Sequence, residues 1–392
     1  MLILVDARPL QHIGPDDERA HFILSCLRRL VEKGGNEWIF LIDKKLGWSR
    51  DRMKFEVLAQ RVLPGRVGWK WWYGRQVPKL MRDHSPDIFV STSGIAAGNG
   101  AGVRDRGGRL IPQCLWMPVR IQEGPDAVYG PIYKRRWMKS ADSAQSMLCF
   151  SEKDRGVLEG GVADKIGVLT PAPEEGIIPM TWEEKEKVKT ELTGGREYFF
   201  SDLSLGSRQE AVGLLKAFSI FKKRQHSNLR LVLTGEPGGR GEPFHVSLAS
   251  YKYRQEVHWF RGTREFRGTE KAAGLEKSGD PNRKDLERMM GACYGLILPF
   301  REDGLGIHLL NAWKARVPVI ARGRGAHAEE VAGEGGALMV KEDKPDILAA
   351  ALMRIYTDEG LRGLLMDTGT ERLGSFTEER PLAEIERMWG KG

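Results

Sequence analysis

An acidic turn, two glycines and a polar helix position follow one another within residues 296–319. Asp303 precedes Gly304 and Gly306, which allow the chain to tighten, and the next segment has the apolar spacing of a helix. Backbone amides at the start of such a helix point outward and attract an anion. Asn311 comes about 7.5 Å further along that helix, at the usual rise per residue. The pattern therefore predicts a site for an anionic ligand, framed by a carboxylate and an amide.

These residues need a parallel sheet to bring them to one edge. The run LILPF at 296–300 has the composition of a buried strand, 307–313 that of a helix, and VPVIA at 317–321 that of a second strand. The same order of strand, loop and helix opens the chain with LILVD at 2–6 and restarts with EYFFSD at 197–202. An alternation of this kind predicts an α/β fold with parallel sheets.

The length of 392 residues fits two domains better than one. The stretch 162–179 is rich in proline and has no periodicity, so we expect the first domain to span 1–175 and the second 176–375. Gly14 stands alone in the first loop, where a dinucleotide fingerprint would need three glycines. NAD is therefore not expected as a cofactor.

Composition narrows the class of protein further. The chain is 41% apolar and 29% charged, and it shows neither a run of eighteen apolar residues nor a secretory signal, so we predict a cytoplasmic protein. A net charge of +8 would suit a phosphate-bearing substrate or an anionic membrane, which favours a peripheral position on the inner face of the cell membrane. No nucleic-acid module is present, so nucleic acid is not an expected partner. The four cysteines lie far apart in apolar sequence, which predicts buried free thiols and no metal site.

The stretch 69–75 interleaves aromatic and basic residues and allows two interpretations. It could insert into a membrane interface, or it could form a helix whose aromatic side packs on the core. The second interpretation is favoured, because soluble domains commonly bury such residues.

The motif around the acidic turn has a close relative. Asp303-Gly304-Leu305-Gly306, followed by Asn311-Ala312 and Pro318-Val319-Ile320, resembles the signature of family 4 retaining glycosyltransferases of the GT-B fold. The segment AHAEEV at 326–331 and the glycine-alanine stretch at 335–338 are similar to the next parts of that signature. The family's two glutamates, which have seven residues between them, are replaced here by Asp303 and Asn311.

The resemblance implies two Rossmann-like domains facing across a cleft, with the C-terminal helix, 376–392, returning to the first domain. Gln113 stands where the family has a histidine near the transferred sugar, and Gln209 where it has a lysine that grips the donor diphosphate beside Arg208. The catalytic residues it implies are Asp303, Arg208 and Gln113. The donor-binding residues it implies are Gly304, Leu305, Gly306, Ile307, Asn311, Gln209 and Glu330. The loop on the acceptor side would be formed by Gly14, Asp16 and Asp17.

The expected activity is metal-independent transfer of a hexosyl-type group, with retention, in polysaccharide biosynthesis. The partners would be a nucleotide sugar, which serves as substrate and not as a cofactor, and a glycan or lipid-linked acceptor. The alternative is a catalytically silent binding or scaffold protein with the same fold, because several of the family's charged positions are substituted together. Turnover of a nucleotide sugar would favour the enzyme, and absence of any nucleotide binding would favour the scaffold.

Overall fold

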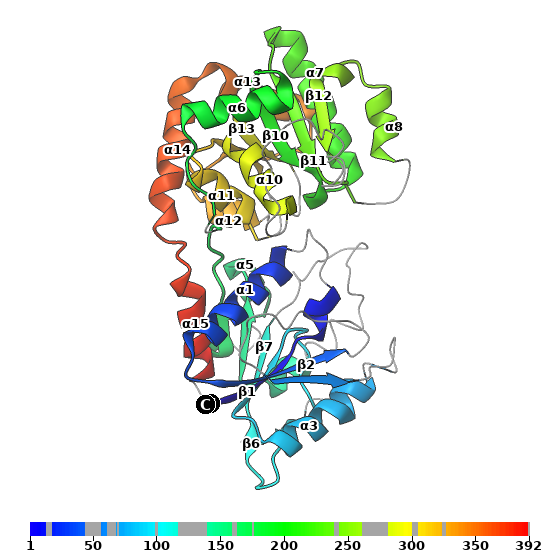
Figure 1. The fold of residues 1–392 in the computed structure, drawn as a ribbon, viewed down its shortest axis with the longest axis vertical. Helices are drawn as coiled ribbons and strands as arrows, with labels where there is room; N and C mark the ends of the chain where they lie inside the picture. The colour runs from blue at the N-terminus through cyan, green and yellow to red at the C-terminus, as the bar shows by residue number, and fades with distance from the viewer. Residues whose placement is uncertain are drawn as a thin grey trace. The chain divides into compact units, whose positions relative to one another are not determined.

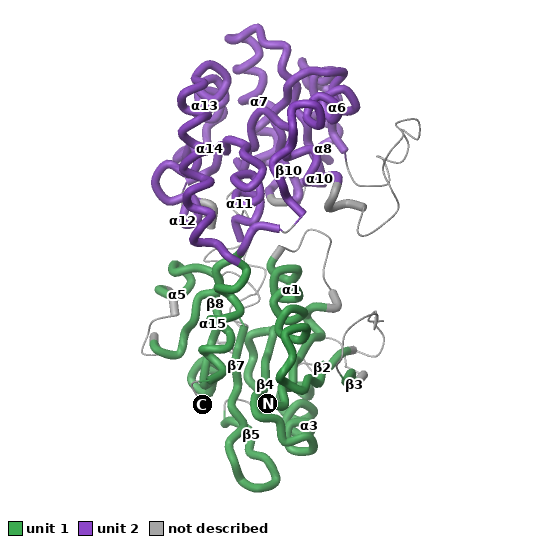
Figure 2. Tube along the Cα trace, turned by 60° about the vertical axis from the view of Figure 1, so that its left-hand side comes forward, with its two compact units in different colours: residues 1–171, 378–392 green, residues 172–377 purple. Residues whose placement is uncertain are grey.

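The structure is a computed structural model. It describes residues 1–12, 18–43, 56–60, 68, 70–98, 101–116, 139–158, 163–174, 176–238, 243–260, 281–299, 305–323 and 327–390. Two compact units divide the chain: unit 1 is Met1–Pro171 with Glu378–Gly392, and unit 2 is Ala172–Thr377 (Figure 2). The expected boundaries were residues 175 and 375.

Unit 1 is built on a parallel sheet. Its described residues form seven strands in the order β3-β2-β1-β4-β7-β8-β9. Figure 1 labels β1, β2 and β7 of this sheet. The strands are β1 (Leu2–Asp6), β2 (Glu37–Asp43), β3 (Glu56–Gln60), β4 (Ile88–Ser91), β7 (Gln113–Trp116), β8 (Ser146–Cys149) and β9 (Ile166–Val168). In β1, Leu4 pairs with Ile39 on one side and with Phe89 on the other. Parallel strands buried on both faces read as continuous apolar runs, which is the pattern of LILV in β1.

Helices and short turns cover this sheet. They are η1 (Arg8–His12), α1 (Glu18–Lys33), η2 (Trp72–Gln76), α3 (Val77–His84), α5 (Glu152–Leu158), η3 (Ala163–Lys165) and α15 (Glu379–Trp389), and a small hairpin adds β5 (Val103–Arg104) and β6 (Leu110–Ile111). Trp72 and Tyr73 lie in the core with α3 and the centre of the sheet, and Trp71 packs against that core. The core-packing interpretation is therefore confirmed for Trp71, Trp72 and Tyr73, whereas Trp69 lies outside the described residues.

The C-terminal helix α15 belongs to unit 1 although α14 before it belongs to unit 2. It packs against β8, β9 and α1. The indoles of Trp38 and Trp389 meet edge to face with ring centroids 5.8 Å apart, and Lys33 Nζ lies 2.7 Å from Glu386 Oε1. An apolar contact and exposed ion pairs therefore fasten the end of the chain to the unit in which it began.

Unit 2 has a second parallel sheet. Its described strands run in the order β12-β11-β10-β13-β14-β15. The strands are β10 (Tyr198–Asp202), β11 (Arg230–Thr234), β12 (Val257–Phe260), β13 (Gly295–Leu298), β14 (Val319–Arg322) and β15 (Leu338–Val340). The helical elements are α6 (Trp182–Thr193), η4 (Leu203–Leu205), α7 (Arg208–Gln225), α8 (Phe244–Ala249), η5 (Arg254–Glu256), α10 (Pro281–Gly291), α11 (Ile307–Lys314), α12 (His327–Ala332), α13 (Pro345–Thr357) and α14 (Glu359–Leu373).

Alternate residues of each strand in unit 2 face two different helical layers. In β10, Tyr198 and Phe200 join a core that includes residues of α6, α10 and α11. Phe199, between them, joins a core that includes residues of α7, α8 and α13. Because successive side chains of a strand point to opposite faces, the sheet is the middle of three layers. The expected α/β class with parallel sheets is confirmed.

Two further observations bear on the expectations from composition. All four cysteines are buried and free, as predicted. Among the described residues, no helix combines the length and the apolar character needed to cross a bilayer.

Candidate functional site

The order in which strands are added to the sheet of unit 2 reverses between β10 and β13. The chain proceeds from β10 outward through β11 and β12, and then returns to add β13, β14 and β15 on the other side of β10. The loops after β10 and β13 therefore leave the sheet in opposite directions. Ligands of open α/β sheets bind in the crevice that this divergence creates outside the carboxyl ends of the strands. The starts of α7 and α11, which follow these two loops, are thus the first candidates for a site.

The loop after β10 ends in a strong helix start. Ser207 caps α7 through a capping box, in which its hydroxyl accepts from the amide of Glu210 and the Glu210 carboxylate accepts from the amide of Ser207. Arg208 is the first residue of the helix, is partly exposed, and its amide donates to Gly238 O at 2.9 Å. A guanidinium at the positive end of a helix dipole suits an anionic ligand.

A second guanidinium holds this helix start in place. Arg322, at the end of β14, is 7% exposed and lies 3.1 Å from Glu210 Oε1 and 3.2 Å from Asp343 Oδ2. The other oxygen of Glu210 accepts from both the amide and the hydroxyl of Ser207. Arg322 therefore reaches the cap of α7 through Glu210. An open pocket lies here, lined by the start of α7, the ends of β14 and β15, and the start of α13.

The start of α11 is shaped by a glycine. Gly306 has φ +76°, in the left-handed region that a side chain rarely adopts, and its carbonyl accepts the first helical hydrogen bond, from Leu310. Leu305, directly before Gly306, is fully buried. The first amides of an α-helix lack acceptors within the helix, so this turn and helix start can face an anion.

A carboxylate and an imidazole connect the two loops. Asp202, the last residue of β10, is 5% exposed, and its Oδ1 accepts from Ser204 N at 3.1 Å and Ser204 Oγ at 2.9 Å. His308, in the first turn of α11, places Nε2 3.5 Å from the other oxygen of Asp202. Neither Asp202 nor His308 was among the predicted site residues. The signal that could have found Asp202 is its place, because it is the polar end of a buried strand next to the switch in strand order.

Comparison with known proteins relates unit 2 to a protein family. Residues 183–371 match the model of the family described as glycosyl transferases group 1. The match covers most of unit 2, which is therefore similar to group 1 glycosyltransferase domains. A search of curated proteins gave no match.

Solved structures similar to the whole chain belong to the same class. HepE of Anabaena in complex with UDP-glucose is 13% identical, with each chain covered in full and a TM-score of 0.73. WaaG, a glycosyltransferase involved in lipopolysaccharide biosynthesis, is 14% identical over 99% of this chain and 98% of its own, with a TM-score of 0.66. Sucrose-phosphate synthase of Thermosynechococcus elongatus is 12% identical over 100% of this chain and 98% of its own, with a TM-score of 0.69. The fold is GT-B, with a Rossmann-like sheet in each unit.

Asn311, on α11, forms a side-chain hydrogen bond with the protein's own backbone. It is 5% exposed, and its Oδ1 accepts from the amide of Glu174 at 2.9 Å. Lys314, one turn further along α11, donates to Glu174 O at 2.7 Å. The two side chains hold both polar backbone groups of Glu174 on the helix. The ribose contact expected for Asn311 stays a prediction.

Gln113 lies in unit 1, at the start of β7, and is 2% exposed. Its Oε1 accepts from Ala97 N at 2.8 Å, and its Nε2 donates to Ala97 O at 3.2 Å. Both ends of the amide therefore replace a strand partner for the backbone of the loop after β4. The catalytic role expected for Gln113 stays a prediction, and the contacts present give its side chain a structural role.

Replacing Gln113 with alanine is expected to destabilise the protein by about 1–3 kcal/mol, because the buried amide and carbonyl of Ala97 would lose their partners. The measurement is the urea midpoint of the full chain. Leu110→Ala, 52% exposed in the neighbouring hairpin, is the control and should change the free energy of unfolding by less than about 0.5 kcal/mol. Equal midpoints for the two variants would contradict the structural role.

Ile307 is buried at the first position of α11, and the remaining predicted residues fall into two groups. Gln209 and Glu330 are exposed, in the first turns of α7 and α12. The others lie outside the described residues: Asp303, Gly304, Gly14, Asp16 and Asp17. Within the described part of the chain, no group of three or more His, Cys, Asp or Glu residues is placed to hold a metal ion.

Proposed function

We propose that the protein is a retaining, metal-independent glycosyltransferase that moves a hexosyl-type group from a nucleotide sugar to a glycan or lipid-linked acceptor. The observation that carries the proposal is the pair of helix starts at the switch point of unit 2, where Arg208 opens α7 and Gly306 opens α11. A diphosphate is the part of a nucleotide sugar that such a pair would bind.

In the proposed reaction, the bond between the anomeric carbon and the diphosphate breaks and a bond to an acceptor hydroxyl forms. The acceptor proton leaves with the diphosphate. Arg208 and the amides from Gly304 to Ile307 stabilise the negative charge that develops on the leaving group. Asp303 accepts hydrogen bonds from the sugar hydroxyls, and Asn311 contacts the ribose. Gln209 and Glu330 complete the donor site, and Gln113 is proposed to contact the transferred sugar.

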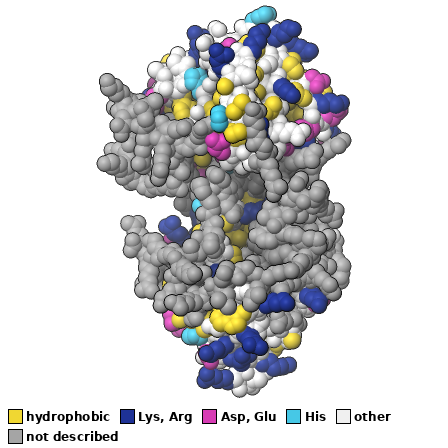
Figure 3. Space-filling view, turned by 90° about the vertical axis from the view of Figure 1, so that its right-hand side faces the viewer, with side chains coloured by type: hydrophobic (Ala, Val, Ile, Leu, Met, Phe, Trp, Pro, Cys, Tyr) yellow, Lys and Arg dark blue, Asp and Glu magenta, His cyan; other side chains and the backbone are white. Residues whose placement is uncertain are grey.

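The acceptor is proposed to bind unit 1 through the loop that contains Gly14, Asp16 and Asp17. The basic charge of the chain supports a position at an anionic membrane surface on the cytoplasmic side, and Lys and Arg side chains gather on the part of unit 1 drawn at the bottom of Figure 3. The exposed arginines of the β5–β6 hairpin are partly neutralised, since Arg106 pairs with Asp83 and Arg109 with Asp87. The hairpin is therefore less basic than its arginines alone indicate.

The test is a panel of nucleotide sugars, beginning with UDP-glucose because HepE was solved with it. Calorimetry should show one binding site, and release of nucleoside diphosphate should accompany transfer to an acceptor glycan, with or without EDTA. Proton NMR of the product gives the anomeric configuration. Absence of nucleotide binding across the panel would overturn the proposal.

The alternative, a silent binding protein with the same fold, is favoured by one specific observation. Gln113 and Asn311 stand at two of the family's polar positions, and both are engaged by backbone groups of this chain. Binding of a nucleotide sugar without release of nucleoside diphosphate, in the presence of an acceptor panel, would support this alternative.

A further inference from the structure

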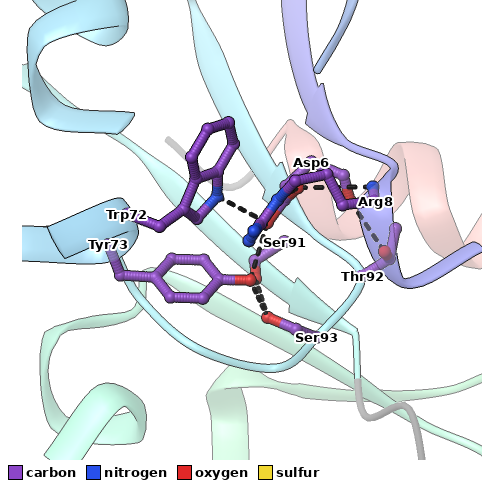
Figure 4. A network of polar contacts seen from close by, with 7 residues as sticks. All are labelled: Asp6, Arg8, Trp72, Tyr73, Ser91, Thr92 and Ser93. Carbon is purple, nitrogen blue, oxygen red and sulfur yellow. Dashed lines mark hydrogen bonds and ion pairs between the residues drawn. The ribbon is translucent and has the colours of Figure 1, made fainter. Parts of the chain in front are cut away.

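Unit 1 has a switch point of its own, between β1 and β4. The chain passes from β1 to β2 and β3 on one side, and β4, β7, β8 and β9 follow on the other. Asp6 ends β1 and Ser91 ends β4, so both lie at the carboxyl edge of the sheet, where ligands of such sheets bind. A network of polar side chains occupies this place (Figure 4).

The centre of the network is the carboxylate of Asp6, which is fully buried. It accepts from Arg8 Nε at 3.0 Å and Nη2 at 3.1 Å, from Trp72 Nε1 at 3.3 Å, and from the hydroxyl of Tyr73 at 2.6 Å. Burial, with the Asp6 charge next, raises the pKa of Tyr73 well above its usual value, so the phenol remains a donor. Both carboxylate oxygens are therefore occupied within unit 1, and Asp6 acts as a clamp.

The group that Asp6 clamps is the guanidinium of Arg8. The side chain of Arg8 is only 10% exposed, and its Cζ lies 3.8 Å from the centroid of the Trp72 ring, in cation–π contact. Burial opposes the charged form, but the Asp6 carboxylate and Tyr73 outweigh it and the pKa of Arg8 is raised. The guanidinium is thus charged, stacked on an indole and held in one orientation.

The Asp6 carboxylate forms no hydrogen bond with one terminal nitrogen of this guanidinium, Nη1. Arg8 has five N–H donors, and Asp6 engages Nε and Nη2. The Tyr73 hydroxyl also lies close to the guanidinium and favours its charged form, but the Asp6 carboxylate does not engage Nη1. Nη1 is not among the buried side-chain nitrogens that lack a partner. A rigid, charged arginine whose Nη1 is not taken up by Asp6, at a ligand-binding edge, can therefore donate to an oxygen that a ligand supplies.

We propose that Arg8 binds a singly charged oxyanion, a carboxylate or a phosphodiester, on the acceptor substrate. The assignment of this ligand to the acceptor substrate rests on the proposed glycosyltransferase function. The charge of Asp6 balances that of Arg8, so the site offers oriented hydrogen bonds and little net positive charge. A group with one negative charge fits such a site better than a dianion. The two donors on Nη1 can meet one oxygen or a pair of oxygens on the ligand.

The test uses the full chain without nucleotide sugar, so that it does not depend on turnover. Methyl glucuronide, its neutral counterpart methyl glucoside, and dimethyl phosphate are titrated by ligand-observed NMR. We expect an anionic probe to bind at least tenfold more tightly than the glucoside. Binding of the glucuronide alone would identify a carboxylate acceptor, binding of dimethyl phosphate alone a phosphodiester, and binding of both the shared chemistry.

The matched variants are Arg8→Lys and Arg106→Lys. Lysine at position 8 keeps the charge beside Asp6 but removes Nη1, so anion binding should fall about tenfold or more, while Arg106, whose side chain is 76% exposed, should make no difference. The near-ultraviolet dichroism of the tryptophans shows whether the Trp72 environment is kept. Equal binding of glucuronide and glucoside, no binding of either anion, or unchanged binding in a folded Arg8→Lys variant would overturn the proposal. Nucleotide binding in the panel described above is scored separately, so failure of one idea is distinguishable from failure of the other.

Discussion

Replacing Arg208 with alanine is expected to weaken nucleotide-sugar binding by roughly 10- to 150-fold, the equivalent of losing a charged hydrogen bond worth about 1.5–3 kcal/mol. Arg208 is the first residue of α7, and the helix start behind it is held by Ser207, Glu210 and Arg322. Its position therefore does not depend on its own side chain. The loss should appear in the calorimetric Kd for the donor that binds in the panel.

The matched control for Arg208 is Arg224→Ala, an exposed arginine in the last turn of the same helix. It removes the same charge from the chain and should leave the Kd unchanged. Asp303→Asn should weaken binding less than Arg208→Ala, because the expected partners of Asp303 are neutral hydroxyls. Equal or reversed effects at 208 and 303 would show that the diphosphate has been assigned to the wrong residues.

Trp313→Ala is expected to lower the free energy of unfolding by about 3–5 kcal/mol, the usual cost of removing a large buried aromatic side chain. Trp313 is 1% exposed and lies on α11, the helix whose start forms part of the candidate site. Its indole fits between Gly336 and Gly369, where an added Cβ would come within 2.5 Å and 2.2 Å of the ring. Its Nε1 donates to Gly336 O at 2.7 Å. The substitution leaves both a cavity and a buried carbonyl without its partner.

The experiment is urea unfolding of the full chain, compared with Trp182→Ala. Trp182 opens α6 in the same unit and is 71% exposed, so its removal should cost less than about 0.5 kcal/mol. The Trp313 variant should also lose donor binding at temperatures where the wild type retains it. Similar unfolding midpoints for the two variants would contradict the role assigned to the Trp313 indole.

The architecture could be predicted from local sequence because its signal is local. Strands buried on both faces must be apolar throughout, and LILV in β1 and YFF in β10 state this directly. The aromatic stretch was also interpreted correctly, since Trp72 and Tyr73 lie in the core. The burial of the four cysteines could be predicted from the apolar residues around them in the sequence.

The polar contacts could not be predicted in the same way, because their partners are distant in sequence. The amide of Glu174 donates to Asn311, which is 137 residues away in the sequence. Trp72 and Tyr73 donate to Asp6, and only the folded chain brings these side chains together. A motif shows which residue types stand at which spacing, but not which backbone group approaches them. The assigned roles of Arg208, Asp303 and Asn311 in binding a donor stay predictions that the experiments above test.

The attachment of Glu174 to α11 has a mechanical consequence. On the side of unit 1, Leu169 N donates to Cys149 O at 2.7 Å, and on the side of unit 2, Asn311 and Lys314 hold Glu174 by its backbone. Any pivot at this crossing is therefore confined to the residues from Thr170 to Pro173. Proline fixes φ at two of these positions, so the pivot is short and stiff. Bending here would involve only a few backbone torsions, and Glu174 would move together with α11.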